Sequence, residues 1–269
     1  MIRKSSGRSS RNAISIARVK RETFIRSLEY HRAYPSTNTR AMEIAEEASS
    51  AIPALVITEI QTAGRGRGEN VWWSAAGALT FSLVLDLENR RANPQSWPTF
   101  ALATAVAVCE TLEARDPELQ FGIRWPNDVF CGNRKICGIL PELCGTSRLV
   151  LGIGVNVNNA MVEAPEALRQ TAVSLIDLTG KRWNLTETLI ALLQTLERRF
   201  DDPELPDAWA KRCLLRGHEV TVRFETREST GLCRGIEPNG ALLLEIGNTC
   251  ERFYGGTIVG IDGKPTSSV

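Results

Sequence analysis

Alternation of apolar and polar residues indicates several β-strands between residues 28 and 156. The clearest one spans residues 79–87, in which every second position is apolar: Leu79, Phe81, Leu83, Leu85 and Leu87. Shorter strands are predicted at residues 28–34 and 54–59. A further group is predicted at residues 121–125, 129–130, 135–143 and 148–156. Short turns join the members of this group, which favours antiparallel pairing.

Helices are predicted in three places between and after these strands. Residues 35–38 end the first strand and cap a helix that runs to about residue 50. Residues 97–114 are rich in small side chains, which suits a helix that lies close to a sheet. The third helix follows Asn184, and its apolar positions repeat at helical spacing: Leu185, Leu189, Leu193, Leu196 and Phe200.

The C-terminal part of the chain has a different pattern. Residues 213–262 alternate short β patterns with turn signals such as Pro238-Asn239-Gly240, which is typical of a small β-barrel. The predicted fold class is therefore α+β. A mixed or antiparallel sheet flanked by helices is expected in residues 27–212, and a small β domain in residues 213–269.

Residues 1–26 are rich in Arg, Lys and Ser and lack a sustained apolar period, which predicts a flexible basic arm. The arm lacks the apolar core of a secretory signal, so export is not expected. It is also too short for a helix-turn-helix domain, so sequence-specific DNA binding is not expected either.

The overall composition excludes several classes of protein. The 32 basic and 31 acidic residues nearly cancel, which leaves no general attraction to nucleic acid or to a membrane surface. The apolar runs are too short to span a bilayer. The seven cysteines include no C-x-x-C pair, and the chain has two histidines. Reduced thiols in a cytoplasmic protein are therefore favoured over a metal site.

Residues 61–68, Gln-Thr-Ala-Gly-Arg-Gly-Arg-Gly, form the most unusual segment. Alternating glycines let the backbone approach a ligand, and the arginines between them supply cationic groups suited to phosphate or carboxylate oxygens. The segment matches neither a dinucleotide-binding fingerprint nor a phosphate-binding P-loop. It predicts an anion-binding loop. A nucleic-acid-binding Arg-Gly segment and a plain exposed loop are the alternatives.

Two further segments carry unusual residues inside predicted strands. Lys135 lies in an otherwise apolar strand shortly after the Arg-Trp-Pro-Asn-Asp run of residues 124–128, so it either reaches solvent or faces a buried anion. Gly152 and Gly154 share one face of a strand, where glycine weakens packing unless something lies against it. A ligand, a bulge or a close helix would each explain these glycines.

These segments together resemble the biotin–protein ligase family. Five matches occur in the family's order, at residues 36–38, 61–72, 124–128, 135–140 and 152–156. The resemblance implies a catalytic domain like that of class II synthetases, followed by a small SH3-like β domain. It implies a ligase that lacks the helix-turn-helix repressor domain of bifunctional members. Asn70 and Ala75-Ala76 depart from the family pattern beside the loop, so the resemblance does not extend to how the loop closes over the ligand.

The resemblance also assigns roles to individual residues. The catalytic group would be Lys135, Arg65, Arg67 and Asp128, with Asp128 orienting or deprotonating the incoming amine. Biotin would contact Ser36, Thr37, Asn38, Gln61, Gly64, Arg65, Gly66, Arg67, Lys135, Gly138, Gly152 and Gly154. The nucleotide would contact Arg67, Trp72, Asn127, Lys135 and Asn156, with Trp72 against the adenine.

The activity that the resemblance implies has two steps and needs no nucleophile from the protein. Biotin and ATP would form biotinyl-5′-AMP and pyrophosphate, with Mg²⁺ as the counter-ion of ATP. Biotin would then pass to a lysine of a biotin carboxyl carrier protein. A cytoplasmic monomer or homodimer without membrane contact is expected. The alternatives are a lipoate or octanoate ligase or transferase of the same fold, a nucleic-acid-binding module that uses the Arg-Gly loop, and a catalytically inactive, biotin-responsive regulator.

Overall fold

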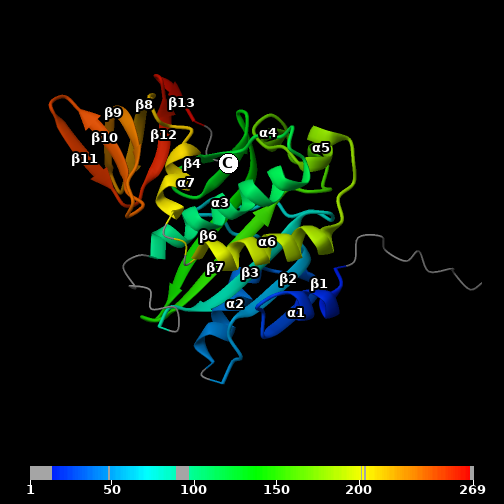
Figure 1. Ribbon diagram of the computed structural model, residues 1–269. Coiled ribbons are helices and arrows are strands. Elements are labelled where there is room, and N and C mark those ends of the chain that lie inside the picture. Colours follow the sequence, from blue (N-terminus) through cyan, green and yellow to red (C-terminus); the bar gives the residue numbers. More distant parts are fainter. Residues whose placement is uncertain (1–13, 48, 89–96, 201, 203, 267–269) are drawn as a thin grey trace, which may run out of the picture.

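The larger domain is built on a seven-stranded sheet (Figure 1). A computed structural model describes residues 14–47, 49–88, 97–200, 202 and 204–266. The strands lie in the order β1-β2-β3-β7-β6-β5-β4. Their bounds are Ser27–Tyr34 (β1), Ala54–Gln61 (β2), Leu79–Asp86 (β3), Gly122–Arg124 (β4), Asp128–Cys131 (β5), Arg134–Cys144 (β6) and Arg148–Val155 (β7). Only β1 and β2 pair in parallel among these strands, so the predicted mixed sheet is confirmed.

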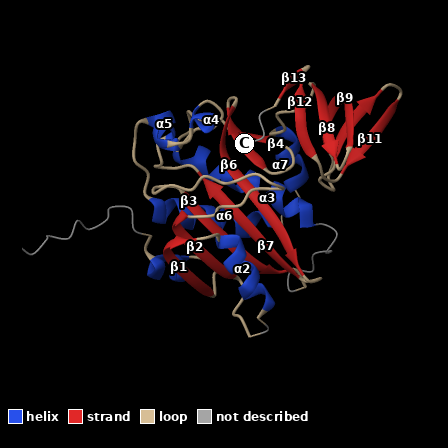
Figure 2. Cartoon of the chain, turned by 180° about the vertical axis from the view of Figure 1, so that it is seen from behind, coloured by secondary structure: helices blue, strands red, loops and turns tan. Residues whose placement is uncertain are grey.

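Helices cover both faces of this sheet. Helices α3 (Trp97–Arg115) and α6 (Leu185–Phe200) lie together across one face (Figure 1), and α2 (Thr37–Glu46) lies across the other (Figure 2). The alternation in β3 explains this arrangement, because Phe81 and Leu83 pack in the large core with α3 and α6. Val84, on the opposite face of the strand, packs against α2. Because apolar side chains fill the face towards α3 and α6, the polar residues of a pocket have to lie on the face that carries α2.

Shorter elements complete the larger domain. These are α1 (Ile16–Glu22), the 3₁₀ turn η2 (Met161–Glu163), α4 (Glu166–Arg169), α5 (Leu175–Thr179) and α7 (Leu205–Lys211). None of the helices within the described residues combines the length and the apolarity that crossing a bilayer requires.

The smaller domain is a six-stranded antiparallel sheet in the order β11-β10-β9-β8-β12-β13. Its strands are Glu219–Phe224 (β8), Arg227–Ile236 (β9), Leu242–Ile246 (β10), Thr249–Phe253 (β11), Thr257–Ile261 (β12) and Lys264–Pro265 (β13). Two tryptophans of the larger domain attach it. Trp125 Nε1 donates to the carbonyl oxygen of Gly240 at 3.0 Å, and Trp209 Nε1 donates to that of Glu237 at 3.2 Å. These bonds hold the turn between β9 and β10 against the larger domain.

Part of the predicted flexible arm is helical. Helix α1 packs on α6 with Val19 fully buried, and Gln194 of α6 donates to the carbonyl oxygen of Glu22 at 2.9 Å. The expectation of an unpacked arm is therefore wrong for residues 16–22. A helix of two turns is too short to show a sustained apolar period. Residues 1–13, the rest of that prediction, lie outside the described residues.

Candidate functional site

A pocket lies on the face of the sheet that carries α2, where the N-terminus of α2 meets β3, β6 and β7. Most residues that the sequence assigned to the site line it: Ser36, Thr37, Asn38, Gln61, Arg65, Gly66, Arg67, Trp72, Asn127, Asp128, Lys135, Gly138, Gly152 and Gly154. Gly64 and Asn156 do not line this pocket. Neither of the chain's two histidines lines it. Residues from five separate segments thus converge on one cavity.

One end of the pocket is a network of hydroxyl and amide groups. The backbone N–H of Thr37 donates to Gln61 Oε1 at 2.7 Å, and the Thr37 hydroxyl donates to the same oxygen at 3.1 Å. The hydroxyl of Ser82 lies 2.8 Å from Thr37 Oγ1 and 2.5 Å from Asn38 Oδ1. Since a serine hydroxyl carries one proton, Ser82 donates to one of the two at a time. Ser36, Thr37 and Asn38 are buried, so this polar end is built into the interior.

Glycines form the floor of the pocket. Gly138 and Gly154 are register partners on β6 and β7, and Gly152 pairs with Leu140. A Cβ at Gly152 would lie 2.1 Å from Asn38 Oδ1, and a Cβ at Gly154 would lie 2.4 Å from Trp72 Cε2. The floor therefore requires glycine because Asn38 and the Trp72 ring lie directly on the backbone.

The Arg-Gly segment forms a small hairpin beside the pocket. Arg65 and Val71 form an antiparallel β-bridge, and Gly66 N–H donates to the carbonyl oxygen of Asn70 at 2.7 Å. At its base, Trp72 N–H donates to the carbonyl oxygen of Gly64 at 3.1 Å. A Cβ on Gly64 would lie 2.3 Å from the Trp72 oxygen, so glycine is required there for the hairpin to close. Gly64 thus supports the pocket without lining it.

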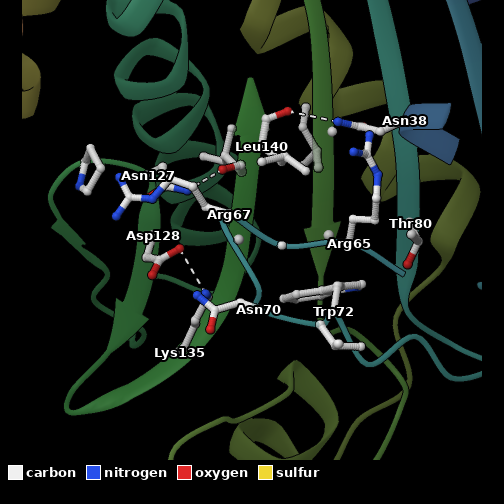
Figure 3. Close-up of a pocket in the computed structure, with 18 of the residues that line it drawn as sticks. Asn38, Arg65, Arg67, Asn70, Trp72, Thr80, Asn127, Asp128, Lys135 and Leu140 are labelled. Atoms are coloured by element: carbon white, nitrogen blue, oxygen red, sulfur yellow. Dashed lines mark hydrogen bonds and ion pairs between the residues drawn. The ribbon is translucent and has the colours of Figure 1, made fainter. Parts of the chain in front are cut away.

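The three cations of the sequence hypothesis share the cavity but occupy two ends of it (Figure 3). Arg65 Nη2 bonds Glu142 Oε2 at 2.7 Å, and Asn38 Nδ2 donates to the same carboxylate oxygen at 2.7 Å. Arg65 is therefore neutralised beside the polar end. The sequence had placed it with Arg67 and Lys135, and Glu142 was given no role.

Lys135, Asp128 and Arg67 form the charged end. Lys135 Nζ lies 3.0 Å from Asp128 Oδ1, and the lysine side chain is 9% exposed. Its burial beside a carboxylate favours the buried-anion interpretation over a solvent-facing lysine. Arg67 Nη2 donates to Thr257 Oγ1 of the smaller domain at 2.9 Å. Burial lowers the pKa of Arg67, and the nearby Asp128 carboxylate acts in the opposite direction.

A second, smaller cavity adjoins the pocket behind Trp72. Its lining is mostly apolar and includes Trp72, Trp73, Lys135, Asn156, Met161, Leu168 and Ala172. Trp72 and Lys135 border both cavities, so the two spaces meet at these side chains. Asn156, which the sequence assigned to the nucleotide, lies in this second cavity.

The side-chain amide of Asn127 is occupied by the backbone. Its Nδ2 donates to the carbonyl oxygen of Ile139 at 2.5 Å, and Ile139 N–H donates back to the carbonyl oxygen of Asn127 at 3.0 Å. Asn127 therefore holds the turn before β5 against β6. This position supports Asp128, which follows it directly.

Several polar contributors were not assigned from the sequence, among them Ser82, Arg124, Glu142, Thr257 and Thr266. Arg124 and Glu142 lie within or next to the matched motifs, and that proximity was an available signal. Thr257 and Thr266 reach the pocket only because the smaller domain docks beside it. No local pattern in their own sequence indicates that contact.

Comparison with known proteins gives matches along most of the chain. Residues 30–158 match the biotin/lipoate A/B protein ligase family, and residues 217–260 match the biotin protein ligase C-terminal domain. The chain is 31% identical over 252 residues to the bifunctional ligase/repressor BirA of Bacillus subtilis, covering 89% of this chain and 76% of that protein. It is 30% identical over 234 residues to the biotin–[acetyl-CoA-carboxylase] ligase of Mycobacterium tuberculosis, covering 83% and 85%.

A solved structure shares the architecture. The biotin protein ligase of Aquifex aeolicus in complex with biotin and ATP aligns with a TM-score of 0.74 at 28% identity. The alignment covers 87% of this chain and 98% of that one.

Proposed function

Because the chain belongs to the biotin/lipoate A/B protein ligase family, we propose that it is an ATP-dependent biotin–protein ligase. It forms biotinyl-5′-AMP and pyrophosphate from biotin and ATP. It then transfers the biotinyl group to a lysine of a carrier protein. The observation that carries this proposal is a single pocket with hydroxyl and amide groups at one end and the cations Lys135 and Arg67 at the other.

The polar end of the pocket selects biotin over other acids. A ureido ring offers one carbonyl acceptor and two N–H donors, and Thr37, Asn38 and Gln61 supply matching groups. A dithiolane ring or an alkyl chain offers no such groups. Lipoate or octanoate would therefore displace hydrogen bonds among these buried groups without replacing them, which costs about 1–3 kcal/mol for each bond lost. The glycine floor gives the fused biotin rings close access to the backbone once the Trp72 ring moves aside.

The charged end suits the first chemical step. The biotin carboxylate itself is the nucleophile, so the protein has to position two anionic groups and offset their repulsion. The buried Lys135 and the half-buried Arg67 are the cations placed to do this. Arg65, held by Glu142, supports the loop beside the biotin end. The apolar second cavity with Trp72 and Asn156 accommodates the adenine, and Lys135 at its border then faces the α-phosphate.

The second step uses the carboxylate of Asp128. The carrier lysine has to lose a proton as its amine attacks the mixed anhydride. Asp128 is 24% exposed and holds Lys135 at 3.0 Å, so it is both reachable from solvent and close to the reacting carbonyl. The hairpin of residues 64–72 covers the intermediate and slows its hydrolysis by water.

Mg²⁺ accompanies ATP in this proposal as the counter-ion of its phosphate groups. No group of three or more His, Cys, Asp and Glu side chains suited to a metal occurs among the residues that the structure describes. The donors present are a lysine-bound carboxylate and amides, so the residues do not fit a metal site of their own. Bound with ATP, Mg²⁺ supplies charge neutralisation to the triphosphate.

The Mycobacterium tuberculosis relative is named for acetyl-CoA carboxylase, and the acceptor in this proposal is the biotin carboxyl carrier protein of such a carboxylase. The proposed reaction takes place in the cytoplasm, where ATP is supplied. All seven cysteines are free thiols, which fits a reducing compartment.

Exchange of labelled pyrophosphate into ATP tests this function. We expect exchange that depends on biotin and falls at least about 100-fold with lipoate or octanoate, because neither acid replaces the hydrogen bonds of the polar end. Mass spectrometry of a biotin carboxyl carrier domain should then show one modified lysine. Exchange supported equally by lipoate would contradict the assignment to biotin.

A further inference from the structure

Arg124, the last residue of β4, lines the main pocket without a polar partner. Its Nε is buried and has no hydrogen-bond partner, and no ion pair of Arg124 occurs within residues 14–47, 49–88, 97–200, 202 and 204–266. Its guanidinium stacks on the Phe130 ring with Cζ 3.8 Å from the ring centroid. Stacking fixes the plane of the group without using its N–H donors. Arg124 thus presents an oriented set of unused donors to the pocket.

The surroundings of Arg124 carry excess positive charge. Arg124 is the register partner of Asp128 across β4 and β5. The Asp128 carboxylate, however, already bonds Lys135 at 3.0 Å, and Arg67 lies near the same carboxylate. Three buried or half-buried cations therefore face one carboxylate. Burial lowers the pKa of Arg124, while Asp128 raises it, and a guanidinium remains protonated in either case.

An unpaired, partly buried guanidinium is costly, and a bound anion compensates for that cost. The carboxylate of biotin and the α-phosphate do not account for Lys135, Arg67 and Arg124 together. Lys135 borders the cavity assigned to adenine, and Arg65 is neutralised by Glu142 at the opposite end. Arg124 and Arg67 both line the pocket, and both lie within electrostatic reach of Asp128. A further anionic group therefore belongs at this end.

We propose that Arg124 binds the β- and γ-phosphates of ATP and the pyrophosphate that leaves. This role rests on the proposed adenylation. In that step a biotin carboxylate oxygen forms a bond to the α-phosphorus, and the bond from the α-phosphorus to the bridging oxygen breaks. The electron pair stays on that oxygen, which departs as part of pyrophosphate. The N–H groups of Arg124 stabilise this charge as it develops, and the planar fork matches two phosphate oxygens at once.

Arg124→Gln tests the assignment in two assays that separate the leaving group from the rest of the reaction. We expect the KM for pyrophosphate in exchange to rise about 100-fold, because one charged donor to the leaving group is lost. Isothermal titration of the same protein with inorganic pyrophosphate should show a similar loss of affinity. The KM for biotin and the rate of transfer from preformed biotinyl-5′-AMP to a carrier domain should stay within about twofold, since pyrophosphate is absent from that step.

Matched variants guard against a general defect. Arg124→Lys keeps the charge and should recover part of the pyrophosphate affinity. Phe130→Leu removes the stacking ring and should weaken pyrophosphate binding less than Arg124→Gln does. Arg134→Gln removes an arginine at the start of β6, outside the pocket lining, and should leave both assays unchanged.

Each outcome decides the proposal. Unchanged pyrophosphate binding in Arg124→Gln would overturn it, as would equal losses in exchange and in transfer from biotinyl-5′-AMP. If Arg124→Gln does not fold, the other two variants decide. The proposal would be overturned if Phe130→Leu bound pyrophosphate as tightly as wild-type protein and Arg124→Lys lost affinity for biotin alone. Failure of wild-type protein to exchange pyrophosphate with biotin present would contradict the proposed ligase function instead.

Discussion

Gly152 and Gly154 decide what can lie on the sheet. The sequence predicted that something lies against these glycines and left a ligand, a bulge and a helix open. In the structure the side chains of Asn38 and Trp72 lie there. Their identity was not predictable from the strand itself, because Asn38 comes from the start of α2 and Trp72 from the end of a hairpin. The expectation that Trp72 borders the adenine stays a prediction, and the ring's place between the two cavities supports it.

Gly154→Ala should disturb the biotin site more than it disturbs the fold. The added Cβ would lie 2.4 Å from Trp72 Cε2, so the ring has to shift. We expect a loss of stability of about 1–3 kcal/mol and a drop in biotin affinity of at least tenfold. Thermal unfolding and calorimetric titration with biotin measure the two effects.

Gly255→Ala is the matched control for this variant. Its Cβ would meet Phe224 at 3.5 Å, which is an ordinary contact. Equal biotin affinity in Gly154→Ala and Gly255→Ala would show that the floor of the pocket is not used as described.

At the scale of elements, the strongest periodic patterns were predicted correctly. The alternation of β3 and the helical repeat of α6 appear with nearly the predicted bounds, because both extend over enough residues to bury one continuous face. Helix α1 was missed because seven residues cannot display that period. The Arg-Gly hairpin was predicted as a loop. Its anchoring through Glu142 was not predicted. Glu142 is 77 residues from Arg65 in the sequence, so only the folded sheet brings them together.

Glu142→Gln should loosen the Arg-Gly hairpin. The carboxylate holds Arg65 and Asn38 together, and its neutral amide loses the ion pair and offers a donor where an acceptor was shared. We expect faster tryptic cleavage after Arg65 and Arg67, by roughly 3- to 10-fold, because about 1 kcal/mol of hairpin closure is lost. Peptide mass spectrometry follows the cleavage sites over time.

The control for this experiment is Glu69→Gln, which neutralises an exposed residue of the same hairpin. It should leave the cleavage rate unchanged. Saturating biotin and ATP should protect wild-type protein, and identical cleavage of both variants would refute the role of Glu142 in closing the hairpin.

At the scale of the whole molecule, the smaller domain is part of the reaction pocket. Thr257, Ile258 and Thr266 line the cavity, and Thr257 accepts a hydrogen bond from Arg67. Residue 213 lies between the last strand of the larger sheet and the first strand of the smaller one, yet the site spans both. Sequence patterns identify each sheet from local alternation, but the docking of one on the other depends on bonds such as that from Trp125 to Gly240.

Thr257→Val should weaken adenylation without unfolding the smaller domain. Valine keeps the shape of threonine and removes the oxygen that accepts from Arg67. We expect kcat/KM for ATP to fall about 3- to 10-fold, because one hydrogen bond to a charged donor is lost. Single-turnover formation of biotinyl-5′-AMP measures this.

Thr230→Val serves as the comparison, since Thr230 bonds Thr221 on the exposed side of the same domain, away from the pocket. A fall in kcat/KM of the same size in Thr230→Val would trace the effect to general damage of the domain. The role of the Arg67 contact would then be rejected.

The central claim is that Lys135, buried between the two cavities, neutralises charge where the acid meets the α-phosphate. Rapid-quench measurement of biotinyl-5′-AMP formation by Lys135→Ala, with biotin and ATP at saturation, tests this most directly. We predict a rate at least about 100-fold below that of wild-type protein, with the fold intact by circular dichroism. A rate within a fewfold of wild type would contradict the account.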